Sequence, residues 1–323
     1  MEFFKTDKTF DFMGKSKLFI IVSLVLVFAS YALLLTKGLN YGIDFAGGTI
    51  VQVKYEHKAP IGKIRAALKQ KKEFASATVT EFGSPEEVVI RIPTSTTTVG
   101  NDIGDTVRTL LKETGKFDVR RVDMVGPKVG NELREKGLMA MVLSILAILI
   151  YVAFRFEWRF GIASILALVH DVSIALGAIS LFQIDVNLDI LAALLTIMGY
   201  SLNDTIIVFD RIRESIRESK IMDLFRLIND SVTKTLSRTT LTSLTTFFVV
   251  LTLYLFGGEI INGFSFTMLV GVVVGTYSSI FVASPFLKWL GFDVEKFKKK
   301  EAEKERIRIE KERMRAQYEG GVV

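Results

Sequence analysis

Six apolar runs, each long enough to cross a bilayer as a helix, constrain this chain more than any other feature of its sequence. They lie at Leu18–Thr36, Gly137–Phe154, Phe160–Gln183, Leu188–Phe209, Thr239–Phe256 and Phe264–Leu287. Half of the residues are apolar, yet 24% are charged. Those two figures are compatible because the charges are concentrated between the runs. The pattern excludes a soluble enzyme and predicts a polytopic α-helical membrane protein.

The composition also narrows the possible chemistry. The 323 residues include no Cys, which excludes a disulfide framework and Cys-based metal sites. The two histidines, His57 and His170, are too few and too far apart for a His-rich metal centre. We therefore expect no cofactor, no metal and no catalytic residue. The first run lacks the short apolar core and cleavage site of a signal peptide, so we expect it to be retained as a helix.

The distribution of basic residues predicts the orientation in the membrane. The connections 155–159 and 210–238 contain several Arg and Lys residues, whereas 184–187 and 257–263 contain none. Basic connections remain on the cytoplasmic side, while a long segment such as 37–136 crosses largely regardless of its charge. Both termini are therefore predicted to be cytoplasmic. The predicted units are a cytoplasmic N-terminus (1–17), a first span (18–36), an extracytoplasmic domain (37–136), a five-helix bundle (137–288) and a charged cytoplasmic tail (289–323).

Two charged segments on the cytoplasmic side, 210–238 and 289–323, each carry a formal net charge of +2. In 210–238, apolar residues recur at helical spacing, which predicts an amphipathic helix lying on the membrane surface. Glu alternates with Lys and Arg in the tail, which favours a solvated helix that contacts anionic lipid head groups. Contact with nucleic acid is disfavoured because no aromatic residues are interleaved with the basic ones.

The extracytoplasmic segment reads as a small α+β domain. Strands are predicted at Thr49–Tyr55, Ala75–Phe82, Val88–Ile92 and Phe117–Val125, with helices at Pro60–Lys72 and Gly100–Thr114. This βαββαβ order is the ferredoxin-like arrangement. The domain contains no set of residues that predicts catalysis. Its first glycines, in Gly42–Gly48, permit a tight bend where the chain leaves the membrane.

Ionisable residues inside the spans are the strongest indicators of function, because they are costly in hydrocarbon and tend to mark an ion pathway. The third span carries His170 and Asp171, the latter about 16 Å from its cytoplasmic end. The fourth carries Asp189, Asn203 and Asp204. Asp189, Thr196 and Asn203 recur every seven residues among small residues, and Asp204 falls about 60° from Asp189 on the helix. This face is predicted to meet protein or water and not lipid.

The fifth span begins with Arg238 and a stripe of hydroxyl groups, among them Thr242 and Thr246. A carboxylate at Asp204 and a guanidinium at Arg238, at similar depth beside hydroxyls, are the parts of a proton relay. The alternative is a static ion pair that holds two helices together, although such pairs contribute little net stability. Asp171, His170, Asp189, Asn203, Thr242 and Thr246 are predicted to support the relay. In the sixth span, Gly271-x-x-x-Gly275 predicts close helix packing.

Several motifs resemble those of the SecF family of bacterial protein-export membrane proteins, within the resistance–nodulation–division superfamily. They are Gly42–Gly48, His170-Asp171-Val172, the long fourth-span motif Gly199–Glu214 and the fifth-span motif Ser237–Thr246. The resemblance covers the six spans and the outer domain and leaves out the charged tail. It implies that the proton-sensitive pair consists of Asp204 and Arg238.

The resemblance also implies partners and a role. It implies an obligate SecD subunit, association with the SecYEG channel, YajC and a membrane insertase, and contact with the translocating preprotein. The expected role is proton-driven late-stage preprotein translocation across the bacterial inner membrane. Two alternatives stay open: an exporter of a lipid or small molecule from the same superfamily, and a non-transporting assembly scaffold whose charges only bind partners. The coupling ion is expected to be H⁺.

Overall fold

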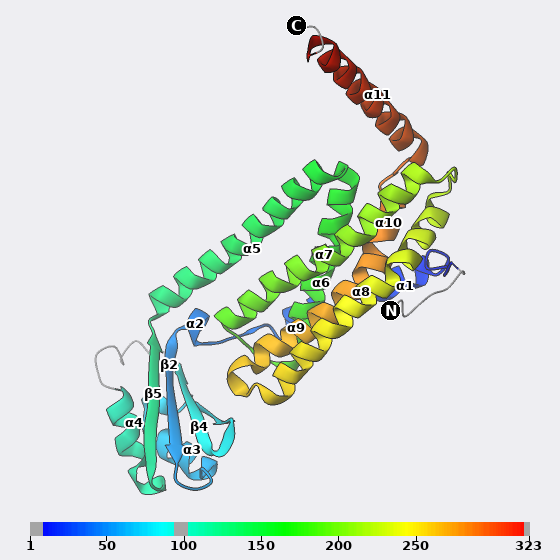
Figure 1. The fold of residues 1–323 in the computed structure, drawn as a ribbon. Helices are drawn as coiled ribbons and strands as arrows, with labels where there is room; N and C mark the ends of the chain where they lie inside the picture. Colours follow the sequence, from blue (N-terminus) through cyan, green and yellow to red (C-terminus); the bar gives the residue numbers. More distant parts are fainter. Residues whose placement is uncertain (1–8, 94–102, 320–323) are drawn as a thin grey trace.

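The computed structural model describes residues 9–93 and 103–319 and contains a helical bundle, a small α+β domain and a projecting C-terminal helix (Figure 1). The six predicted spans are confirmed within the described residues. Their helices are α1 (Ser16–Thr36), α5 (Pro127–Arg155), α6 (Trp158–Phe182), α7 (Leu188–Glu218), α8 (Leu224–Phe256) and the continuous segment α9 (Glu259–Ser278), η3 (Ser279–Ala283) and α10 (Ser284–Trp289). Residues 1–8 of the predicted cytoplasmic N-terminus lie outside the described residues.

The small domain has the predicted ferredoxin-like βαββαβ order. Its elements are β2 (Gly48–Tyr55), α3 (Ile61–Lys69), η1 (Lys72–Phe74), β3 (Thr78–Phe82), β4 (Ser84–Pro93), α4 (Ile103–Leu111), η2 (Lys112–Thr114) and β5 (Phe117–Val125). The strands form one antiparallel sheet in the order β3-β4-β2-β5. Ile64 of α3 and Val107 of α4 share a buried core with Val51 and Val53 of β2. Residues 100–102 of the predicted second helix lie outside the described residues.

The hairpin between β3 and β4 differs in detail from the prediction. Its turn is at Gly83, where φ is +70°, and Ser84 and Pro85 already belong to β4. Ser84 is paired with Phe82 across the turn. Glycine adopts this left-handed conformation without steric cost, which allows the turn at Gly83 and lets β4 begin at Ser84, before the predicted start of the strand at Val88.

The domain is joined to the bundle by more than its two chain connections. Strand β1 (Asn40–Tyr41) pairs in parallel with β6 (Asp185–Val186), between α6 and α7. Arg91 of β4 forms an ion pair with Asp185. The short helix α2 (Ile43–Ala46) lies against Gly130 of α5, where a Cβ atom would lie 3.0 Å from the carbonyl oxygen of Phe45. These contacts couple the domain directly to the ends of the spans.

The segment 210–238 is not a separate helix on the membrane surface, so this part of the prediction is wrong. Its first part continues α7 to Glu218, and its second part forms the first turns of α8 from Leu224 onward. The side chains of Leu224, Ile228 and Val232 are buried in the main core of the bundle. The helical spacing does correspond to a helix. Its apolar stripe packs on protein, because neighbouring helices such as α7 are long enough to cover it.

The end of the α+β domain and the packing of the charged tail also differ from the prediction. Helix α5 begins at Pro127, so residues 127–136 are helical and do not belong to the α+β domain. Because the first turns of α5 contain charged residues, the apolar run that predicts this span begins only at Gly137. The tail helix α11 (Val294–Glu319) projects from the bundle (Figure 1). Its start is anchored, since Phe292, Val294 and Phe297 are buried in the bundle core.

Candidate functional site

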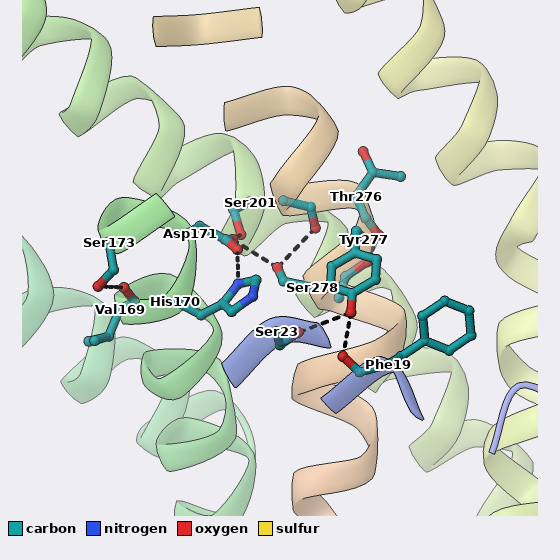
Figure 2. A network of polar contacts seen from close by, with 12 residues as sticks. Phe19, Ser23, Val169, His170, Asp171, Ser173, Ser201, Thr276, Tyr277 and Ser278 are labelled. Carbon is teal, nitrogen blue, oxygen red and sulfur yellow. Dashed lines mark hydrogen bonds and ion pairs between the residues drawn. The ribbon is translucent and has the colours of Figure 1, made fainter. Parts of the chain in front are cut away.

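Asp171 lies at the centre of a buried polar cluster formed by three helices (Figure 2). Its Oδ2 accepts hydrogen bonds from Ser201 of α7 (2.5 Å) and Ser278 of α9 (2.8 Å). Its Oδ1 lies 2.8 Å from Nδ1 of His170, the preceding residue of α6. Neither Asp171 nor Ser278 has any exposed surface. Since a buried polar group is costly unless it is hydrogen-bonded, these partners hold Asp171 in place.

Asp204 is the second fully buried carboxyl group of the bundle. Its Oδ2 accepts a hydrogen bond from Ser243 of α8 (3.2 Å), and Ser243 in turn accepts one from Thr276 of α9 (2.7 Å). Its Oδ1 has no hydrogen-bond partner among the described residues. A buried carboxylate with one neutral donor is poorly compensated in hydrocarbon, so this arrangement suits the neutral acid.

Helices α7 and α9 connect the two carboxyl groups. Ser201 contacts Asp171 and precedes Asp204 by three residues, about 4.5 Å along α7. On α9, Ser278 binds Asp171 while Thr276 leads through Ser243 to Asp204. Directly after Ser278, the helix widens into the π-turn η3. Turns of this kind are rare in proteins, and those that do occur are often at functional sites. This supports an assignment of the region as the functional centre.

The structure does not bring together Asp204 and Arg238, the predicted pair. No ion pair among the described residues joins them, and the side chain of Arg238 is exposed. Thr239 and Ser243 point inward on α8, and Arg238 precedes Thr239 by one residue, so it projects about 100° away from that inward face. Arg238 is also about 7.5 Å along the helix from Ser243.

The other predicted residues divide between the site and the outside of the bundle. His170 belongs to the Asp171 cluster. Asp189 is half-buried at the start of α7, and Asn203 is exposed. Thr242 and Thr246 donate hydrogen bonds to carbonyl oxygens of their own helix, so these hydroxyl groups do not donate to Asp171 or Asp204. On the predicted polar face of α7, Asp204 therefore lies inside the bundle, whereas Asn203 is exposed.

Residue-by-residue reasoning missed Ser201, Thr276 and Ser278 as site residues. The available signal was weak but present. Ser201 lies three residues before Asp204, one helical turn away, and a run of four hydroxyl side chains interrupts the sixth span at 276–279. No group of three or more metal-binding side chains occurs in the described part of the chain.

The fold and the two buried carboxyl groups define a polytopic membrane protein of the transport type, in which one α+β domain is attached to a six-helix bundle. Two family models match the chain. One, described as protein export membrane protein SecD/SecF, C-terminal, matches residues 106–293, and the other, the SecD/SecF GG motif, matches residues 32–59. The chain belongs to the SecD/SecF family of protein-export membrane proteins.

Full-length relatives within this family are called protein translocase subunit SecF. The protein from Helicobacter pylori strain J99 is 49% identical over 323 residues, which is the whole of both chains. The protein from Escherichia coli O157:H7 is 42% identical over 301 residues, covering 92% of this chain and 93% of the relative. These similarities establish a general role in protein export by the Sec pathway.

A solved structure shows the same fold. The crystal structure of SecDF, a translocon-associated membrane protein from Thermus thermophilus, is 37% identical with a TM-score of 0.80. The match covers 89% of this chain but only 39% of the SecDF chain. This chain therefore spans about two fifths of that longer protein.

Proposed function

We propose that this chain is a non-enzymatic subunit of an accessory complex that uses the proton-motive force to promote late-stage preprotein translocation. The observation that carries the proposal is Asp204, fully buried in a membrane-spanning helix with one hydroxyl donor and one unpartnered oxygen. Proton binding at such a group changes the net charge inside the bundle. A potential of 100 mV supplies about 2.3 kcal/mol for each charge moved across the membrane, enough to shift a two-state bundle tens-fold.

Arg238 has a role in this proposal although it is unpaired here. When Asp204 loses its proton, the resulting negative charge attracts cationic side chains, and Arg238 lies on the adjacent helix α8. Formation of this pair requires α8 or its side chain to move relative to α7. The described arrangement, with the two groups apart, corresponds to the protonated state.

SecD is the proposed obligate partner. The matched SecDF chain is more than twice as long as this one, so its unmatched part is a candidate for a separate subunit here. A stripe of small and polar side chains on α7 is exposed in this chain: Ala192, Thr196, Gly199 and Asn203. A stripe of this kind is suited to close helix packing and not to lipid contact.

The remaining partners rest on family resemblance: the SecYEG channel, YajC, a membrane insertase, the translocating preprotein and membrane lipids. Both termini are proposed to be cytoplasmic in the bacterial inner membrane, from the distribution of basic residues. An exporter of a lipid or small molecule and a passive scaffold are the alternatives. A passive scaffold has no need of a poorly compensated carboxyl group in the bundle.

The test is an export assay with inner-membrane vesicles that contain the native complex, with and without an imposed proton gradient. Asp204→Asn keeps the shape and hydrogen bonding of the side chain but cannot ionise. We expect it to abolish gradient-dependent stimulation while ATP-driven early translocation and complex assembly persist. Arg238→Met should impair the same stage.

Asp223→Asn is the matched control, because Asp223 caps α8 at its exposed start through the backbone N–H of Phe225 and asparagine caps equally well. It should retain the full gradient response. If Asp204→Asn also retained it, the proton-coupled role would be rejected in favour of the scaffold.

A further inference from the structure

His170 and Asp171 form a buried ionisable pair that the proposed role of Asp204 does not use. His170 is 6% exposed and Asp171 is 0% exposed. Within the described part of the chain, only Nδ1 of the imidazole has a partner, since Nε2 of His170 is buried without a hydrogen bond. The ring lies near Tyr277 of α9, with ring centroids 6.1 Å apart and planes inclined by 24°. The contacts fix the ring beside the carboxyl group.

The cost of net charge in hydrocarbon limits the protonation of this pair. With one proton, the pair is neutral overall, either as imidazolium and carboxylate or as imidazole and carboxylic acid. With no proton it carries one negative charge, and with two it carries one positive charge, both of which are disfavoured in a buried site. The two serine donors to Oδ2 of Asp171 favour the form with the carboxylate charged.

We propose that His170 and Asp171 are a second proton-binding site of the bundle, which holds one proton between imidazole and carboxylate and is linked to Asp204 through the hydroxyl groups of α7 and α9. The ligand is a single proton, bound or released at Nδ1 or Oδ1, and no covalent bond changes. Release leaves the pair with one negative charge close to Asp204. Ionisation of either site therefore opposes ionisation of the other.

Asp204 is the other fully buried carboxyl group of the bundle, and it lies one helical turn along α7 from Ser201, which contacts Asp171. Among the described residues, α1, α5, α7, α9 and α10 pack against α6, along with η3. The ionisable side chains of these elements, apart from Asp204, are Lys17 and Tyr31 of α1; Lys128, Glu132, Arg134, Glu135, Lys136, Tyr151 and Arg155 of α5; Asp189, Tyr200, Asp210, Arg211, Arg213, Glu214, Arg217 and Glu218 of α7; Glu259 and Tyr277 of α9; and Lys288 of α10. Most of the charged ones lie at helix ends. Only the coupling to Asp204 rests on the proposed function.

The sequence offers a clean probe, because His57 and His170 are the only histidines. His57 is exposed in the outer domain, so His57→Gln leaves a single imidazole without disturbing the bundle. The full chain, labelled with ¹⁵N-histidine and reconstituted in lipid vesicles, then reports the protonation of His170 by solid-state NMR as pH is varied. We expect the ring of His170 to give an imidazolium signal.

Two variants test the assignment, with a matched serine control. Asp171→Asn removes the counter-charge, so the imidazolium signal should be lost and the neutral imidazole should remain. Ser278→Ala keeps the pair but removes one donor to the carboxylate, so the imidazolium fraction should fall. Ser173→Ala alters a buried serine of α6 that bonds to Val169 and Tyr31 instead of Asp171, and the signal should be unchanged.

A His170 that stays neutral at every pH in the unaltered pair, or an imidazolium signal that survives Asp171→Asn, would overturn the proposal. The link to Asp204 is tested separately by Asp204→Asn, which should lower the pH at which the imidazolium signal is lost, because a neutral amide cannot supply the negative charge that Asp204 gains when it ionises at high pH. An unchanged signal in that variant would overturn the link. The NMR readout does not depend on export, so failure of the gradient assay and failure of this inference are distinguishable.

Discussion

Single glycine residues determine how closely α9 approaches α7, next to the polar cluster. A Cβ atom on Gly271 would lie 2.2 Å from the side chain of Ile197, and one on Gly275 would lie 3.0 Å from Cβ of Ser201. The sequence prediction of close packing at these two glycines is confirmed. Because Ser201 is also a donor to Asp171, this packing places a functional hydroxyl as well as stabilising the bundle.

Gly271→Ala should therefore lower the thermal stability of the purified chain in detergent. Overpacking of this kind costs about 1–3 kcal/mol. Gly199→Ala on α7 is the matched control, because a Cβ atom there has no neighbour within 4 Å and alanine favours the helix. Equal melting temperatures for the Gly271 variant and the unaltered chain would show that Ile197 moves aside without cost.

At the scale of elements, the first turns of α8 act as part of the bundle core and not as a membrane-surface helix. Ile228 is fully buried, while Met222, in the short connection before α8, is 57% exposed. The N-terminal segment reinforces this packing, since the backbone N–H of Met13 donates to Asn229 (2.9 Å). The apolar stripe in the first turns of α8 is therefore a packing surface against the rest of the bundle.

Ile228→Ala should lower the free energy of unfolding by about 2–5 kcal/mol, the usual cost of truncating a buried aliphatic side chain. Met222→Ala should change it little. The measurement is chemical unfolding of the purified chain, alongside binding to anionic vesicles. Reduced vesicle binding with unchanged stability would restore the surface-helix interpretation.

At the scale of the whole molecule, six spans place both ends of the chain on one side of the membrane and the α+β domain on the other. Reporter fusions after Lys58 and after Arg315 should therefore report opposite compartments, with the second in the cytoplasm as the basic connections indicate. The same compartment for both fusions would contradict the six-span arrangement. The ion pair between Arg91 and Asp185 and the pairing of β1 with β6 attach the α+β domain to the connection between α6 and α7.

The sequence by itself determined the elements of this protein whose signal is local. Apolar runs predicted six spans, since the bilayer sets their length, and alternation with turn residues predicted the βαββαβ order. The cost of charge in hydrocarbon singled out Asp171 and Asp204, both of which prove fully buried. These inferences need no knowledge of which helices are neighbours.

Only the tertiary structure decided which side chains meet. Ser201, Ser278 and Thr276 become site residues because α6, α7, α8 and α9 pack at particular rotations, and hydroxyl groups are too common in spans to be singled out beforehand. The rotation of α8 also turns Arg238 away from Asp204, although the sequence predicted that the two side chains lie at similar depth in the membrane. The amphipathic stripe of α8 has a helical period whether it contacts lipid or protein, so periodicity predicts a helix but not its partner. Side-chain contacts depend on helix rotation and packing, which the sequence pattern of one helix does not specify.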